Sequence, residues 1–148
     1  MKSLINTLSR TTPGWDTVPV RIAAGAIFAA HGAQKLFGWF GGYGLEGTAG
    51  WMASIGLEPG YLMASLAGGA EFFGGLLLII GLAVRPAALM LAITMLVAIV
   101  TVHFANGLFM SNNGYEYGLV LLVMSIGLMF RGAGNLSADQ ILQAKLSK

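Results

Sequence analysis

The sequence predicts an all-α membrane protein that folds as a bundle of four spanning helices. Charged residues make up 9% of the 148 residues, apolar residues make up 56%, and the mean hydropathy is +0.76. A water-soluble domain carries about 25% charged residues, so this chain has too few charges to cover a surface that faces water. Its length fits one domain over residues 1–148.

Four apolar segments approach the roughly 20 residues that a helix needs to cross a bilayer. We expect them at about residues 18–37, 61–82, 86–106 and 115–130. Basic residues precede the first segment, as in a signal peptide, but Arg21, His31 and Lys35 interrupt it, so we expect it to be retained. In "GLAVRPAAL", Gly81 suits a helix end and Pro86 suits the next helix start, which predicts a tight hairpin.

Short helices are expected outside the spans. Within loop 38–60, "GTAGWMASIGL" predicts a helix in the membrane interface, anchored by Trp51. In the tail, Ser137 and Gln140 have capping-box spacing and predict an amphipathic helix. Apolar residues at positions 4, 5 and 8 indicate a similar helix near the N-terminus.

The basic residues predict the orientation. Four spans place both ends of the chain on one side, which then carries seven of the eight Lys and Arg residues, with Lys35 on the other side. Basic loops favour the cytoplasm, so we expect both termini there, with Arg85 in the 82–86 turn contributing to the bias. Arg21 lies in the inner half of the first span, and we expect its long stem to reach the cytoplasmic surface. A net charge of +2 gives no reason to expect nucleic-acid binding.

Five ionisable residues fall in the expected outer half of the bundle and come from all four spans. Such residues are costly in a membrane and often mark function. They are His31, Lys35, Glu71, His103 and Glu116. Four of them also have a structural interpretation: Glu71 paired with a base could fix helix register, and Lys35 could reach the interface. His103 and Glu116 could be ordinary, partly hydrated residues near the interface, whereas His31 lies deeper and is harder to explain in this way.

Helical periodicity indicates which faces meet. Small residues beside a lone carboxylate let a neighbouring helix approach, so we expect the first two spans to face each other and to bring Glu71 near His31 or Lys35. The expected inward faces are Arg21, Gly25, Phe28, Gly32 and Lys35 on the first span, Ala64, Gly68, Glu71 and Gly75 on the second, and Glu116, Val120, Val123 and Gly127 on the fourth.

Residue types disfavour several kinds of site. The chain has no cysteine, so its own side chains cannot perform thiol chemistry. His31 and His103 differ in expected depth by about 5 Å, which does not suit a haem between two histidines. The His and Glu residues have no recognisable zinc spacing, and "GGAEFFGG" neither follows a strand nor precedes a GK[ST] motif of a phosphate loop. We therefore expect no metal and no haem.

Stretches in order along nearly the whole chain resemble the DoxX family of small four-helix bacterial membrane proteins. They are "RIAAGAIFAAHGAQKLFGWFGG", "GTAGWMASIGL", "AEFFGGLLLIIGLAVRPAAL", "MLVAIVTVHFANGLF", "YEYGLVLL" and "GAGNLSAD". The resemblance implies a bacterial inner-membrane protein, similar to subunits linked with quinone-coupled oxidation, including that of thiosulfate, and with resistance to quinone-like or thiol stress. The family's motif residues map here to Arg21, His31, Lys35, Glu71, Arg85, His103 and Glu116.

The leading hypothesis is a subunit of, or partner to, a quinone-linked redox system. A quinone or similar lipophilic compound would bind in the outer half, where His31 would donate or relay a proton and Glu71 would orient His31 or accept that proton. A redox partner or a bound cofactor would supply electrons. The expected ligand-binding residues are Lys35, His103, Glu116, Phe28 and Phe72.

Two other functions remain open at this stage. One is a non-catalytic membrane scaffold or assembly subunit, in which the polar cluster only joins helices. The other is a small proton-coupled transporter of lipophilic compounds. Small-residue stripes would serve packing within a chain or in a homo-oligomer equally well.

Overall fold

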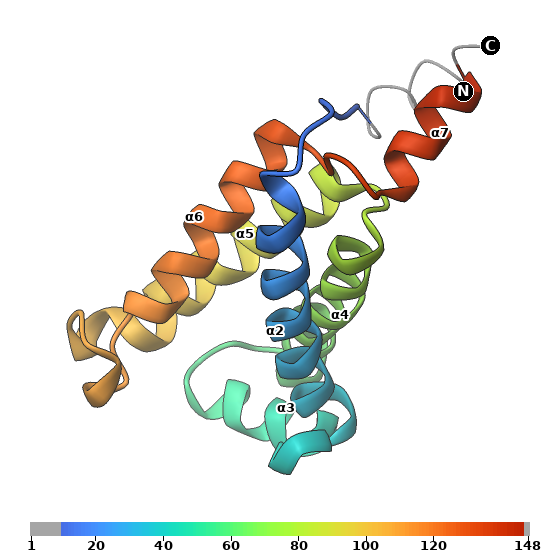
Figure 1. The fold of residues 1–148 in the computed structure, drawn as a ribbon. Coiled ribbons are helices and arrows are strands. Elements are labelled where there is room, and N and C mark those ends of the chain that lie inside the picture. The colour runs from blue at the N-terminus through green and yellow to red at the C-terminus, as the bar shows by residue number, and fades with distance from the viewer. Residues whose placement is uncertain (1–9, 147–148) are drawn as a thin grey trace.

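The computed structural model describes residues 10–146, and within that part the fold is all-helical, with no strand (Figure 1). The six α-helices are α2 (Thr17–Phe37), α3 (Gly44–Ser54), α4 (Gly60–Ile80), α5 (Val84–Ala98), α6 (Glu116–Arg131) and α7 (Ala138–Leu146). After α5 the chain continues as a π-helical turn and a short 3₁₀ turn, Ile99–His103 and Phe104–Asn106. The helix expected at positions 4–8 lies outside the described residues.

Two of these helices are long and apolar enough to cross a membrane. They are α4 and the continuous helical stretch Val84–Asn106. The other two expected spans, α2 and α6, are not among them: charged residues interrupt α2, and the 16 residues of α6 extend only about 24 Å. The four-span bundle and its orientation therefore remain predictions.

The helices pack as two antiparallel pairs, α2 with α4 and α5 with α6 (Figure 1). One end of the molecule holds residue 10, the 81–83 turn and α7, and we call it the termini end. The α5–α6 pair leans away from the other pair, so α3 and loop 104–115 lie apart at the opposite, loop end (Figure 1). Buried residues of all four long helices form the main core, among them Phe28, Leu78, Leu91 and Leu121.

Small residues let α2 and α4 meet backbone to backbone. A Cβ added to Gly32 would collide with the backbone of Phe72, and one added to Gly75 would collide with that of Ala29. The residues of the two expected stripes are buried from Arg21 to Gly32 and from Ala64 to Gly75. The prediction that these two stripes face each other is confirmed.

The predicted inward face of the fourth span is wrong. Val120 is 55% exposed and Val123 is 59% exposed, whereas Leu121 and Leu128 are buried. The prediction used Glu116 to mark the inward face. The packing of the two leucines sets the rotation of α6 instead, because larger apolar side chains gain more from burial in the core.

The prediction that Arg21 reaches the cytoplasmic surface is also wrong. Arg21 is 1% exposed, and its guanidinium donates to five backbone carbonyl oxygens. Two belong to Leu78 and Ile79 in the last turn of α4, and three lie in segment 133–136 between α6 and α7. Only an arginine offers five donors in a planar fork, so this side chain joins three parts of the chain at the termini end.

Helix α7 lies at the same end and contacts the start of α5. The Ser137 hydroxyl accepts a hydrogen bond from the Gln140 backbone N–H at 3.2 Å, which confirms the predicted cap. The buried Asp139 carboxylate accepts the N–H groups of Ala83 and Val84 at 2.8 and 3.0 Å, where α5 begins. Burial raises the pKa of Asp139 above its ordinary value of 3.8, against the lowering effect of these two bonds.

Arg85, which the sequence assigns to topology, also has a structural role. Its guanidinium donates to the carbonyl oxygen of Arg10 at 2.7 Å and to that of Phe130 at 2.8 Å. It therefore links the start of α5 to the segment before α2 and to the end of α6.

Candidate functional site

A buried ion pair joins α2 to α4. Glu71 lies in the middle of α4 and is 3% exposed, and Lys35 lies in the last turn of α2. Lys35 Nζ and Glu71 Oε2 are 2.6 Å apart. The contact is possible because Gly32 and Gly68 hold the two helices close. The expectation that Glu71 lies within reach of Lys35 is confirmed.

Helix α3 covers the outer side of this pair. The Thr48 hydroxyl donates to the carbonyl oxygen of Lys35 at 3.3 Å, and Ala49 and Met52 pack on Ala64 of α4. The helix expected in this loop therefore forms, beginning three residues earlier than the sequence motif, and it contacts α2 at Lys35; its place in a membrane interface stays a prediction.

His31 lies one helical turn from Lys35, nearer the termini end, and its side chain is exposed. Within the described residues it forms no ion pair, so Glu71 is the partner of Lys35 and not of His31. The imidazole ring faces the phenol ring of Tyr117 in the first turn of α6, with centroids 6.2 Å apart and planes tilted by 56°. An accessible imidazole thus lies beside a fixed pair of charges.

Sequence reasoning missed Tyr117. A tyrosine phenol carries no charge near neutral pH, so Tyr117 does not belong to the set of charged residues that predicts the site, whereas its neighbour Glu116 does. The available signal was the position of Tyr117 at the start of an apolar segment, where a polar hydroxyl can reach into a helix interface.

His103 and Glu116 are held by the loop that joins α5 to α6. The His103 Nδ1 atom lies 2.9 Å from the carbonyl oxygen of Asn113, to which it can only donate. Glu116 Oε1 accepts the backbone N–H of Met110 at 2.6 Å. Both contacts order residues 104–115. The structure therefore brings His31, Lys35 and Glu71 together and gives the other two residues partners of their own.

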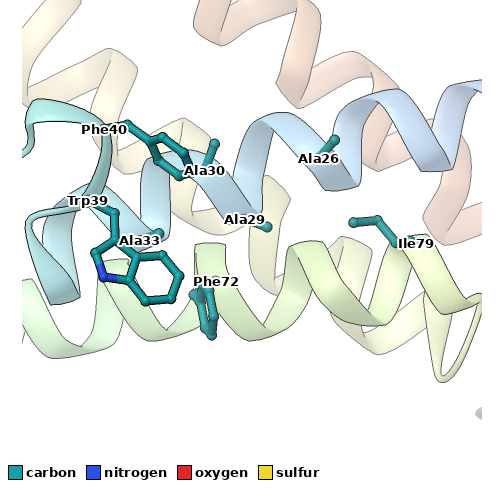
Figure 2. A pocket seen from close by; sticks show the side chains of 8 residues that line it. All are labelled: Ala26, Ala29, Ala30, Ala33, Trp39, Phe40, Phe72 and Ile79. Atoms are coloured by element: carbon teal, nitrogen blue, oxygen red, sulfur yellow. The ribbon is translucent and has the colours of Figure 1, made fainter.

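The two expected apolar wall residues are in different surroundings. Phe28 is buried in the main core. Phe72 lines a shallow groove of about 280 Å³ on the outside of the α2–α4 pair. Figure 2 shows a row of α2 alanines along the groove, with Trp39 and Phe40 near its loop end and Phe72 across on α4. The groove is lined by Ala26, Ala29, Ala30, Ala33, Trp39, Phe40, Phe72 and Ile79, and none of these is ionisable.

The donor set suits a neutral oxygen acceptor better than a metal. In the part of the chain that the structure describes, no group of three or more His, Asp or Glu residues is placed to hold a metal ion. The His31 imidazole and the Tyr117 hydroxyl are both able to donate a hydrogen bond. A carbonyl oxygen accepts two such bonds, so a quinone carbonyl fits the chemistry of these side chains.

The fold and the comparisons together define the class: this is an all-helical membrane protein. The chain belongs to the DoxX family, whose model matches residues 17–104. The matched part includes His31, Lys35, Glu71 and His103, and it ends before α6.

Three relatives extend the comparison. A Bacillus subtilis protein named "Putative oxidoreductase CatD" is 37% identical over 123 residues, which are 83% of this chain and 84% of the relative. An uncharacterized protein of Haemophilus influenzae is 32% identical over 127 residues, covering 81% of this chain and 85% of the relative. A second from that organism is 34% identical over 87 residues, 59% of this chain and 58% of the relative. No solved structure matches significantly.

Proposed function

We propose that this protein binds a quinone, or a similar lipophilic carbonyl compound, on the face of α2 that carries His31. It would act as a subunit of, or partner to, a quinone-linked redox system in the bacterial inner membrane, with both termini in the cytoplasm. The observation that carries the proposal is the exposed His31 imidazole beside the buried Lys35–Glu71 ion pair.

The cost of polar groups in hydrocarbon supports this proposal. The Gln34 side chain is one hydrogen-bonding partner of His31. An imidazole at membrane depth has a second ring nitrogen that also needs a partner, since there is little water to serve as one. A ligand carbonyl is such a partner. The Lys35–Glu71 pair neutralises its own charges and fixes α2 against α4, which would hold His31 in a constant position for the ligand.

The chemistry of quinones gives His31 its role. Reduction of a quinone to a quinol takes up two electrons and two protons. An imidazole can give and regain a proton near neutral pH, so His31 would deliver protons to the carbonyl oxygen that it contacts. The electrons would come from a redox partner protein or its cofactor. The redox assignment is supported by the name of the Bacillus subtilis relative, "Putative oxidoreductase CatD".

The experiment uses the purified protein in mild detergent. Co-purifying lipids and quinones are extracted and identified, and the unfolding temperature is measured with and without menadione. We expect bound quinone and a menadione-dependent rise in the unfolding temperature of the wild type. In His31→Ala this rise should vanish while the ligand-free unfolding temperature stays the same. A wild-type protein without bound quinone and without stabilisation by menadione would count against the proposal.

A scaffold role is the second candidate, because the closed Lys35–Glu71 pair and the Arg21 network are sufficient as structural links. If His31→Ala and Glu71→Gln only lower stability and never alter ligand binding, the scaffold is favoured. If liposomes that contain the protein accumulate a lipophilic compound only under a pH gradient, a transporter is indicated instead.

A further inference from the structure

Tyr117 differs from its neighbour Tyr115, although both lie where α6 begins. The Tyr115 ring stacks on Phe104, with centroids 5.8 Å apart and planes 21° apart, and so packs the loop. Tyr117 instead turns its ring toward His31 on α2, and its side chain is 37% exposed. The two tyrosines therefore provide a matched pair, one with a packing role and one facing the candidate site.

The Tyr117 hydroxyl has no hydrogen-bond partner among residues 10–146. Because Tyr117 is partly exposed, its hydroxyl is accessible to a ligand, and a tyrosine combines an apolar ring with such a polar group. The ring that carries this hydroxyl also lies 6.2 Å, centroid to centroid, from the imidazole of His31, which belongs to a different helix pair. A polar group that binds at this position would satisfy both side chains at once.

We propose that Tyr117 is the second polar contact of the ligand site, donating its hydroxyl hydrogen to the same ligand carbonyl oxygen that His31 contacts. This inference rests on the proposed function and adds a specificity-determining residue to it. One carbonyl oxygen accepts two hydrogen bonds, so the two donors fit a single acceptor.

Two consequences follow from the positions of these residues. The site prefers a ring compound with a carbonyl group to a hydrocarbon of the same shape, because only the carbonyl oxygen can accept hydrogen bonds from both donors. A bound ligand also bridges α2 and α6, which meet only along part of their length, and so joins the two helix pairs. Tyr117 lies on α6, beyond residues 17–104 that the family model matches.

The test is a binding titration of the full-length protein in detergent with menadione and with 2-methylnaphthalene, which has the same ring system without carbonyls. Tyr117→Phe removes only the hydroxyl. We expect it to raise the dissociation constant for menadione about 5- to 10-fold, the effect of one lost hydrogen bond, and to leave that for 2-methylnaphthalene unchanged. Tyr115→Phe, the matched control, should leave both constants at their wild-type values.

The outcomes separate the two proposals. Menadione binding that is weakened by His31→Ala but unaffected by Tyr117→Phe would overturn the role of Tyr117 and leave the proposed function standing. A wild-type protein that does not bind menadione at all would overturn both. Irreversibly misfolded protein lowers the number of binding sites per mole of protein and leaves the dissociation constant of the folded fraction unchanged. A general loss of folding stability in Tyr117→Phe would instead weaken the binding of menadione and 2-methylnaphthalene alike, so the comparison of the two ligands separates it from a lost hydrogen bond.

Discussion

Removing one member of the Lys35–Glu71 ion pair should destabilise the protein, and the two members should not be equivalent. Breaking a buried pair costs about 3–5 kcal/mol, because it leaves an uncompensated charge. Glu71 is almost fully buried, whereas the Lys35 side chain is 25% exposed. We therefore expect Lys35→Met, which leaves the buried carboxylate alone, to cost about 3–5 kcal/mol. Glu71→Met leaves an ammonium that can reach the interface, and should cost about 2–3 kcal/mol.

The double variant separates electrostatics from packing. In Lys35→Met/Glu71→Met both charges are absent and the side-chain volumes are nearly kept. Replacing a buried pair by apolar residues is often neutral or stabilising, so we expect a free energy of unfolding within about 1 kcal/mol of the wild type.

The measurement is unfolding by SDS titration from mixed micelles, followed by circular dichroism and by the fluorescence of the three tryptophans. A double-mutant cycle over the four proteins gives the interaction energy. If the losses in the two single variants simply add in the double variant, the side chains do not interact and the pairing is refuted. Equal losses in the two single variants would refute the argument from unequal burial.

Three further predictions concern packing and the termini end. Gly32→Ala should lower the free energy of unfolding in SDS by about 1–3 kcal/mol, because the added Cβ would collide with Phe72. In the control Gly69→Ala the added Cβ meets nothing within 4 Å, so this variant should be neutral or stabilising. Equal effects of the two substitutions would contradict this packing. Arg21→Lys should cost about 2–4 kcal/mol in the same assay, since an ammonium with three donors cannot reach all five carbonyls; an unchanged midpoint would refute the network. The raised pKa of Asp139 means that its charged form is less favourable in the folded state, so its contribution to stability should decline as pH rises from 3.8 through its folded-state pKa. The free energy of unfolding is measured for the wild type and for Asp139→Asn at pH 4, 6 and 8. The stability of the wild type relative to the variant should fall as pH rises, and a rise would contradict the raised pKa of Asp139.

Much of the helical architecture follows from local sequence. Apolar runs, Gly81 and Pro86 place the helix ends within a few residues, because they depend on local backbone preferences. The contact of α2 with α4 also follows from the sequence. Gly25 and Gly32 recur at helical spacing on α2, as Gly68 and Gly75 do on α4, and such small residues let a neighbouring helix approach closely.

The errors have a common physical origin in contacts between distant segments. Arg21 looks able to reach water until segment 133–136, over 100 residues later, covers it and supplies carbonyl partners. Glu116 suggests an inward face for α6, but its carboxylate is taken by the backbone of Met110. No pattern within one helix reports such partners, and the facing of Tyr117 and His31 escapes prediction for the same reason.

The binding position is tested most directly by photolabelling with an azido-substituted quinone in membranes that contain the protein. After digestion, mass spectrometry should find the label on the peptides that contain His31 and Tyr117. An excess of menadione should displace it, and His31→Ala should prevent it. Label spread over exposed apolar residues such as Leu66 and Ile93, and not displaced by menadione, would contradict a quinone site between α2 and α6.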